Sequence, residues 1–191
     1  SCGVDAAGPH AVVKAGSKTY AYDSRGNMTS RNGVQLAWNA SGKLIQAGSE
    51  RYAYGHDTSR IKKVNASGGV TYYIGDDYEV DPTGRATIYI TLGGVTVAKK
   101  QGNTPYWIHT DHQGSLDVLS DSQGREVQRQ FYKGYGRQVH SMRRDITPVD
   151  FTETRGYTGQ RADEGGLIYL HARYHDPVLG RFISADPIVP S

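Results

Sequence analysis

The sequence predicts an all-β protein: a long, curved or spiralled antiparallel sheet of consecutive β-hairpins, with a C-terminal segment packed against it. Composition is the first observation, because glycine (24 of 191 residues) and tyrosine (14) are abundant while leucine is scarce. Such a composition favours turns and strands over helices. A recurring turn pattern and period-two alternation of apolar residues are the second and third observations.

The recurring unit is an aromatic or apolar residue, then Asp or Asn, two further residues, Gly and a polar residue, followed by an apolar run. Asp and Asn side chains cap such turns, and Gly supplies the backbone φ above zero that they need. Each copy therefore predicts two strands joined by a short turn. The copies are 20–33, 34–45, 51–61, 64–70, 78–88 and 118–127, and the copy at 51–61 has Ser59 where Gly is expected.

Paired tyrosines indicate how these units assemble. Tyr20 and Tyr22 share one face of a strand, as do Tyr52 and Tyr54, because side chains alternate between the two faces. One hairpin cannot bury such a face, so the units are expected to pair edge to edge into a long sheet. No segment predicts a helix, and residues 149–161 are too broken by Thr and Gly to form one.

Charge and cysteine content exclude several classes of protein. The net charge is +3, too balanced to indicate nucleic-acid binding. Cys2 is the only cysteine, so no intrachain disulfide can form. No apolar run approaches the ~18 residues of a membrane helix. Residues 1–10 have no signal-peptide pattern, and the absence of an initiator Met suggests that the chain begins inside a longer one.

Three motifs in order carry a resemblance to a known family. The first is Tyr22–Thr29, which reads YDSRGNMT, and the second is Ile108–Ser115, which reads IHTDHQGS and is followed by DSQG at 121–124. The third joins GYTGQR at 156–161 to the run Gly166–Pro187. Together they resemble the Rhs/YD-repeat proteins, the third motif being similar to their repeat-associated core. The sequence departs from that pattern at Gln113, Leu170, His171 and His175.

This resemblance implies a spiralled β-shell that encloses and delivers a C-terminal polymorphic toxin, with the core segment rolled inward as a plug. It divides the chain into a lead-in at 1–19, a YD-repeat sheet at 20–155 and a truncated core at 156–191. The partners implied are the rest of the shell and its toxin cargo, and the protein would be secreted or delivered to cell surfaces in bacterial competition. Unpaired sheet edges would promote self-association.

Within the core segment, the strand Gly180–Ile183 is expected to anchor the plug. Phe182 and Ile183 would pack on opposite faces of that strand. Three core arginines, namely Arg161, Arg173 and Arg181, are expected to pair with acids such as Asp163 and Asp176.

The resemblance to the Rhs/YD-repeat proteins also implies a candidate protease, because self-cleaving members of that family act as aspartic proteases. Such proteases need two carboxylates that share a proton. Asp186, in the sequence SADP, matches the first of these positions, but the following residues, IVP, depart from the family motif and the second motif is missing. Asp176 is the second candidate within the chain. The alternative, favoured here, is that 176–180 is a turn capped by Asp176 with Pro177 fixing φ.

Aromatic side chains give a third hypothesis, a carbohydrate-binding surface. Tyr72, Tyr73 and Trp107 could stack on sugars, although tyrosines half-buried in a sheet face are the favoured alternative. No cofactor is expected. No metal site is expected either, since His109 and Asp111 share a strand face while His112 points away.

Overall fold

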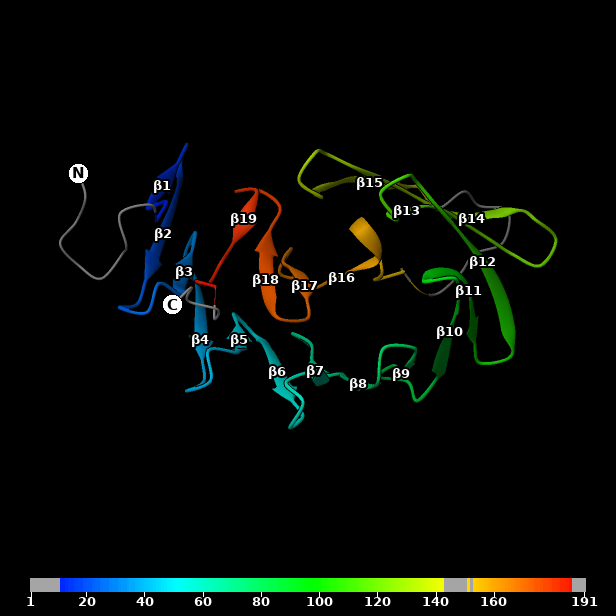
Figure 1. Ribbon diagram of the computed structural model, residues 1–191, viewed down its shortest axis with the longest axis horizontal. Helices are drawn as coiled ribbons and strands as arrows, with labels where there is room; N and C mark the ends of the chain where they lie inside the picture. Colours follow the sequence, from blue (N-terminus) through cyan, green and yellow to red (C-terminus); the bar gives the residue numbers. More distant parts are fainter. Residues whose placement is uncertain (1–10, 143–150, 152, 187–191) are drawn as a thin grey trace.

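The computed structural model describes residues 11–142, 151 and 153–186, which form two antiparallel sheets (Figure 1). Residues 1–10 of the expected lead-in and 187–191 of the expected core lie outside the described residues. The larger sheet has 15 strands in chain order. They are β1 (Lys14–Ala15), β2 (Lys18–Tyr22), β3 (Met28–Arg31), β4 (Val34–Trp38), β5 (Leu44–Ala47), β6 (Glu50–Tyr54), β7 (Arg60–Val64), β8 (Val70–Ile74), β9 (Tyr78–Val80), β10 (Ala86–Leu92), β11 (Val95–Gln101), β12 (Thr104–Thr110), β13 (Leu116–Ser120), β14 (Glu126–Tyr132) and β15 (Gln138–Met142).

The smaller sheet follows a 3₁₀ turn, η1 (Tyr157–Gly159), and lies inside the arc of the larger one (Figure 1). Its four strands also pair in chain order. They are β16 (Arg161–Ala162), β17 (Ile168–Leu170), β18 (Arg173–Asp176) and β19 (Arg181–Phe182). The described residues contain no α-helix, so the all-β prediction is confirmed. We call the larger sheet the curved sheet and the smaller one the inner sheet.

The predicted Asx turns form, and their hydrogen bonds explain the repeat. In five turns, the side-chain oxygen of the Asp or Asn accepts backbone N–H bonds from the residues two and four positions ahead. The Gly three positions ahead has a φ between 77° and 84° in all five. These turns begin at Asp23, Asn65, Asp81, Asp111 and Asp121.

The irregular copy at 51–61 forms a turn of the same kind with different residues. Gly55 takes the place of the Asp, since its N–H donates to Ser59 O at 2.9 Å. Thr58 takes the left-handed conformation, with φ 66°. Thr58 therefore occupies the position that Gly has in the other turns. The expectation that Ser59 occupies it was wrong by one residue.

One face of the curved sheet is concave and buries the tyrosine rings against the inner sheet. Tyr20 and Tyr52 belong to a buried cluster that also contains Tyr169 and Tyr174 of the inner sheet, and Tyr22 and Tyr54 pack against it. The predicted pairing of tyrosines on one face is thus confirmed. Ile183 is fully buried in the same cluster while Phe182 is 39% exposed, which confirms that these two side chains lie on opposite faces.

Curvature comes from irregular pairing. Register shifts interrupt seven of the strand pairs in the curved sheet, among them β6–β7 and β12–β13. A β-bulge bends a strand and increases its twist, so repeated bulges turn a flat ribbon into an arc. In Figure 1 the arc runs from β1 past β8 to β15 and surrounds β16–β19.

The β14–β15 turn closes against the segment before the inner sheet. Tyr157 donates a hydrogen bond from its hydroxyl to Gly134 O at 3.1 Å. Its ring lies against Gly136 so closely that an added Cβ would come within 2.4 Å of Tyr157 Cδ1. Only glycine fits at position 136.

We predict that Gly136→Ala destabilises the protein by at least about 2 kcal/mol more than Gly42→Ala. Both glycines have a positive φ, 84° and 71°, so both variants carry a backbone penalty of about 1–2 kcal/mol. A Cβ at Gly42 meets no atom within 4 Å, whereas one at Gly136 overlaps the Tyr157 ring. Urea unfolding of both variants measures the difference, and equal losses would contradict this packing.

Candidate functional site

Buried ion pairs join the curved sheet to residues 153–176. Arg31 pairs with Asp176 at 2.7 Å, and Arg60 pairs with Asp163 at 2.6 Å. Lys99 pairs with Glu153 at 2.7 Å, while Arg161 reaches back to Glu79 at 3.2 Å. Three of the four carboxylates belong to the C-terminal side and three of the four cations to the curved sheet. We call these four pairs and their immediate partners the docking interface.

Arg60 is the centre of the most buried part of this interface. Its side chain and that of Asp163 are each 1% exposed, and Lys63 adds a second cation 3.5 Å from Asp163. The guanidinium lies 4.4 Å from the Tyr169 ring centroid and 4.8 Å from that of Tyr73. Burial alone would lower the pKa of Arg60, but the Asp163 carboxylate outweighs it and the pKa is raised.

Glu50 supplies the matching acid on the curved sheet. Its carboxylate accepts the Gly165 backbone N–H at 2.9 Å and lies 3.9 Å from Lys63. Burial, and next the Asp163 charge, raise the pKa of Glu50. Two carboxylates, a lysine and an arginine therefore balance one another at this point of the interface.

Glu153 forms the corresponding centre at the other end of the arc. Its carboxylate binds Lys99 and accepts the Tyr89 hydroxyl at 2.9 Å. Its backbone N–H donates to Gln128 at 3.0 Å, and its carbonyl accepts from Gln130 at 3.0 Å. Burial would raise the pKa of Glu153, yet the charge and hydrogen bond of Lys99 outweigh it and lower the pKa.

Asp176, the second candidate catalytic residue, is fully buried and fully engaged. It binds Arg31 through two hydrogen bonds, of 2.7 and 3.2 Å, and accepts the Val178 and Leu179 amides. Gly180 N–H donates to Asp176 O at 2.8 Å, which completes the turn favoured from the sequence. Burial would raise the pKa of Asp176, but the Arg31 bonds and the two amides outweigh it and lower the pKa.

Asp186 lies in a different environment. Its side chain is 54% exposed and pairs with Arg173 at 3.2 Å. The carboxylates of Asp176 and Asp186 are thus held by different arginines, Arg31 and Arg173. A proteolytic role for this pair stays a prediction.

Two of the three core arginines pair with acids other than the two named from the sequence. Arg161 pairs with Glu79 and Arg173 with Asp186. Asp163 and Asp176 instead bind Arg60 and Arg31, both on the curved sheet. The acids that the sequence assigned to contacts within the core therefore contribute to docking.

The three candidate carbohydrate-binding residues are divided between the two faces of the curved sheet. Tyr72 is 49% exposed and Trp107 50% exposed, whereas Tyr73 is 7% exposed. Tyr73 packs on the concave side with Arg60 and Arg161 over its ring. A surface formed by all three rings is therefore not built, while sugar binding by Tyr72 or Trp107 stays a prediction.

A metal site and a membrane-spanning helix each set requirements that can be compared with the described residues. No group of three or more His, Cys, Asp or Glu side chains there could hold a metal ion. His109 instead lies 2.8 Å from the Ser120 hydroxyl through its Nε2. No helix within the described ranges is long and apolar enough to cross a membrane.

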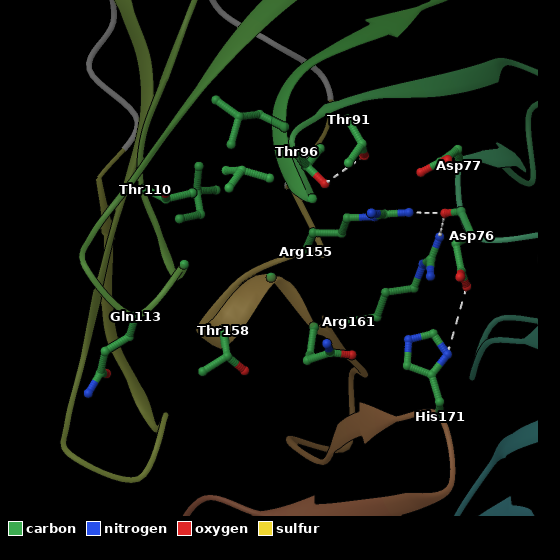
Figure 2. Close-up of a pocket in the computed structure, with 17 residues that line it drawn as sticks. Asp76, Asp77, Thr91, Thr96, Thr110, Gln113, Arg155, Thr158, Arg161 and His171 are labelled. Carbon is green, nitrogen blue, oxygen red and sulfur yellow. Dashed lines mark hydrogen bonds and ion pairs between the residues drawn. The ribbon is translucent and has the colours of Figure 1, made fainter.

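A polar cavity of about 490 Å³ lies between the curved sheet and the segment that leads into the inner sheet (Figure 2). Asp76 and Asp77 contribute from the β8–β9 turn, and Arg155 and Arg161 from the facing segment. Both arginines donate to the carbonyl oxygen of Asp76, Arg161 at 3.1 Å. This cavity was not predicted from the sequence, because the residues that line it come from many turns and strands that are far apart in the chain.

The family comparison matches most of the chain. Residues 9–189 match the family model described as the teneurin YD-shell. Among curated relatives, the tRNA nuclease WapA of Bacillus subtilis (strain 168) is 30% identical over 92% of this chain. The double-stranded DNA deaminase toxin A of Burkholderia cenocepacia (strain H111) is 27% identical over 88%, and the toxin subunit YenC1 of Yersinia entomophaga is 27% identical over 81%. The chain spans only 8%, 12% and 19% of these three relatives.

Solved structures support the same fold. The Photorhabdus luminescens Tc holotoxin pore matches with a TM-score of 0.75 and 23% identity, over 87% of this chain and 9% of that chain. The TcdB2-TccC3-Cdc42 crystal structure matches with a TM-score of 0.69 and 22% identity, over 89% of this chain and 12% of that chain.

We predict that Asp176→Asn lowers the unfolding free energy by about 3–5 kcal/mol at pH 7, because it leaves Arg31 without its buried partner. The pKa of Asp176 is lowered by folding, so its contribution is present above its unfolded pKa of about 3.9 and is lost as the pH falls through the folded value. The variant should therefore lose stability less steeply than the wild type between about pH 5 and pH 2.

Asp117→Asn is the matched control, since Asp117 is 47% exposed and pairs with Arg129 at the surface. Its effect should stay below about 1 kcal/mol. Chemical unfolding across this pH range measures both variants. A pH dependence of Asp176→Asn that equals the wild type would contradict the assignment.

Proposed function

Because the chain belongs to the teneurin YD-shell family, we propose that it forms the last part of a shell wall together with the segment that plugs the shell from inside. The observation that supports this most is the docking interface. Buried charges are costly unless they are paired, and here residues 153–176 supply the acids that match cations on the concave face. A wall that carries unpaired buried cations needs its plug.

The proposal divides the chain by role. Residues 20–155 form the wall, residues 156–191 begin the plug, and residues 1–19 lead into the first repeat. Three of the four pairs join these two parts along the arc, from Arg31 on β3 to Glu79 on β9. The fourth, Lys99–Glu153, holds the segment just before the plug against β11. This distribution holds the plug at several places on the wall at once.

The cargo of such a shell is proposed from the relatives. Two of them are named as toxins and one as a tRNA nuclease, and each is several-fold longer than this chain. A C-terminal toxin enclosed by the wall, in a protein that is secreted or delivered at the cell surface, agrees with those names. Among the described strands, β1 and β15 are the outermost of the curved sheet. Their outer edges would then continue into the rest of the shell, and in the isolated chain such edges favour self-association.

We predict that protease resistance of the cargo depends on the docking interface. In the natural full-length protein, the segment after residue 191 should survive limited proteolysis, because the wall and plug exclude the protease. Asp163→Ala leaves Arg60 buried without its carboxylate and should expose that segment, so that cleavage becomes at least tenfold faster.

Asp117→Ala serves as the control, because it removes an exposed carboxylate and should leave cleavage unchanged. Intact mass measured over time follows the downstream segment. If that segment were digested as fast in the wild type as in Asp163→Ala, the chain would not be part of an enclosing shell.

A further inference from the structure

Arg155 carries a positive charge that forms no ion pair among the described residues, although the charges of Glu79 and Glu153 act on it from a longer distance. Its guanidinium lies 3.7 Å from the centroid of the Tyr89 ring, and its Nε is buried without a hydrogen-bond partner. One Nη donates to the Asp76 carbonyl, an uncharged acceptor that it shares with Arg161. Within the described ranges no carboxylate forms an ion pair with Arg155, whereas Arg161 has Glu79. Burial, and next the Arg161 charge, lower the pKa of Arg155.

This cation borders the cavity of about 490 Å³ shown in Figure 2. Such a volume lies in the range of small-ligand sites. Threonines from several elements line the cavity, and Gln113 and Gln160 line it as well. The threonines are Thr91, Thr96, Thr110 and Thr158. All of these groups can both donate and accept hydrogen bonds.

The lining also excludes two classes of ligand. No Tyr, Trp or Phe lines the cavity, so a sugar ring would have no aromatic face except the imidazole of His171. Asp76, 73% exposed, and Asp77 carry negative charge at the same cavity and would repel a phosphate dianion. A single carboxylate attached to N–H donors suits this lining, because the carboxylate can pair with Arg155 and the N–H groups can donate to Asp76 or Asp77.

We propose that this cavity binds the side-chain carboxylate of an acidic peptide segment. The carboxylate would lie against Arg155 and pair with its guanidinium by charge-assisted hydrogen bonds. Backbone N–H groups of the same peptide would donate to Asp77 and to the threonine hydroxyls. The residues that line the cavity come from both the curved sheet and the segment 155–171. A bound peptide would therefore stabilise the docking of these two parts. This inference rests on the cavity and holds whether or not the chain belongs to a toxin shell.

Four small probes test the ligand class by calorimetric titration: an Asp peptide, its Asn counterpart, acetate and inorganic phosphate. Acetyl-Gly-Asp-Gly-amide should bind at least tenfold more tightly than its Asn counterpart, since only the first carries the charge. Acetate alone should bind more weakly than the Asp peptide, because it lacks the backbone donors. Equal binding of the Asp and Asn peptides would overturn the carboxylate assignment, tighter binding of inorganic phosphate would do the same, and acetate binding as tightly as the peptide would overturn the peptide assignment.

A carboxylate built into the cavity provides a test that needs no ligand. Thr96 lines the same cavity as Arg155 (Figure 2). Thr96→Glu should raise the melting temperature by about 2–4 °C relative to the isosteric Thr96→Gln, and it should abolish binding of the Asp peptide.

Repeating the comparison of Thr96→Glu with Thr96→Gln in an Arg155→Gln background isolates the interaction between the new carboxylate and Arg155. The Glu-minus-Gln difference should vanish there, because the cation is gone. Equal melting temperatures of Thr96→Glu and Thr96→Gln in the wild-type background would overturn the proposal, as would a difference that persists without Arg155.

Discussion

The pairing of buried charges between the curved sheet and the C-terminal segment is the constraint on which the rest of the structure depends. Each of the cations Arg31, Arg60 and Lys99 lies on the concave face, where water cannot solvate it fully. Removing an ion from water costs several kcal/mol, and only a well-placed counter-ion offsets that cost. The C-terminal segment brings those counter-ions, so the concave face of the curved sheet is compensated only when that segment is docked.

The hairpin ladder follows from local chemistry and was therefore predictable. A turn such as Asp81–Gly84 contains its own hydrogen-bond acceptor and its own left-handed residue, so a short stretch of sequence decides it. Alternation likewise placed Tyr20 and Tyr52 on the buried face. The family motifs then indicated that the core segment 156–191 folds against the ladder. The inner sheet, formed by described residues of that segment, lies within the arc in Figure 1.

The docking interface could not be predicted in the same way, because its partners lie over 50 residues apart and bulges change which side chains face inward. Between Ala53 and Tyr54 the register shifts, and this shift pairs Tyr54 with Arg60 and leaves Ile61 out of the ladder. Simple alternation from Lys63 would place Ile61 inside and Arg60 outside, yet Arg60 is 4% and Ile61 44% exposed. A charged residue in phase with a buried tyrosine, such as Lys99 opposite Tyr89, is the one sequence signal that could have revealed the interface.

Docking of the C-terminal segment depends on specific charge pairs and not on apolar contact alone. A double-mutant cycle on Arg60→Met and Asp163→Leu, followed by urea unfolding, tests this claim most directly, since the two side chains are each 1% exposed and 2.6 Å apart. The account predicts a coupling free energy of about 2 kcal/mol or more, with the double variant more stable than either single variant. Additive losses, with a coupling close to zero, would contradict it.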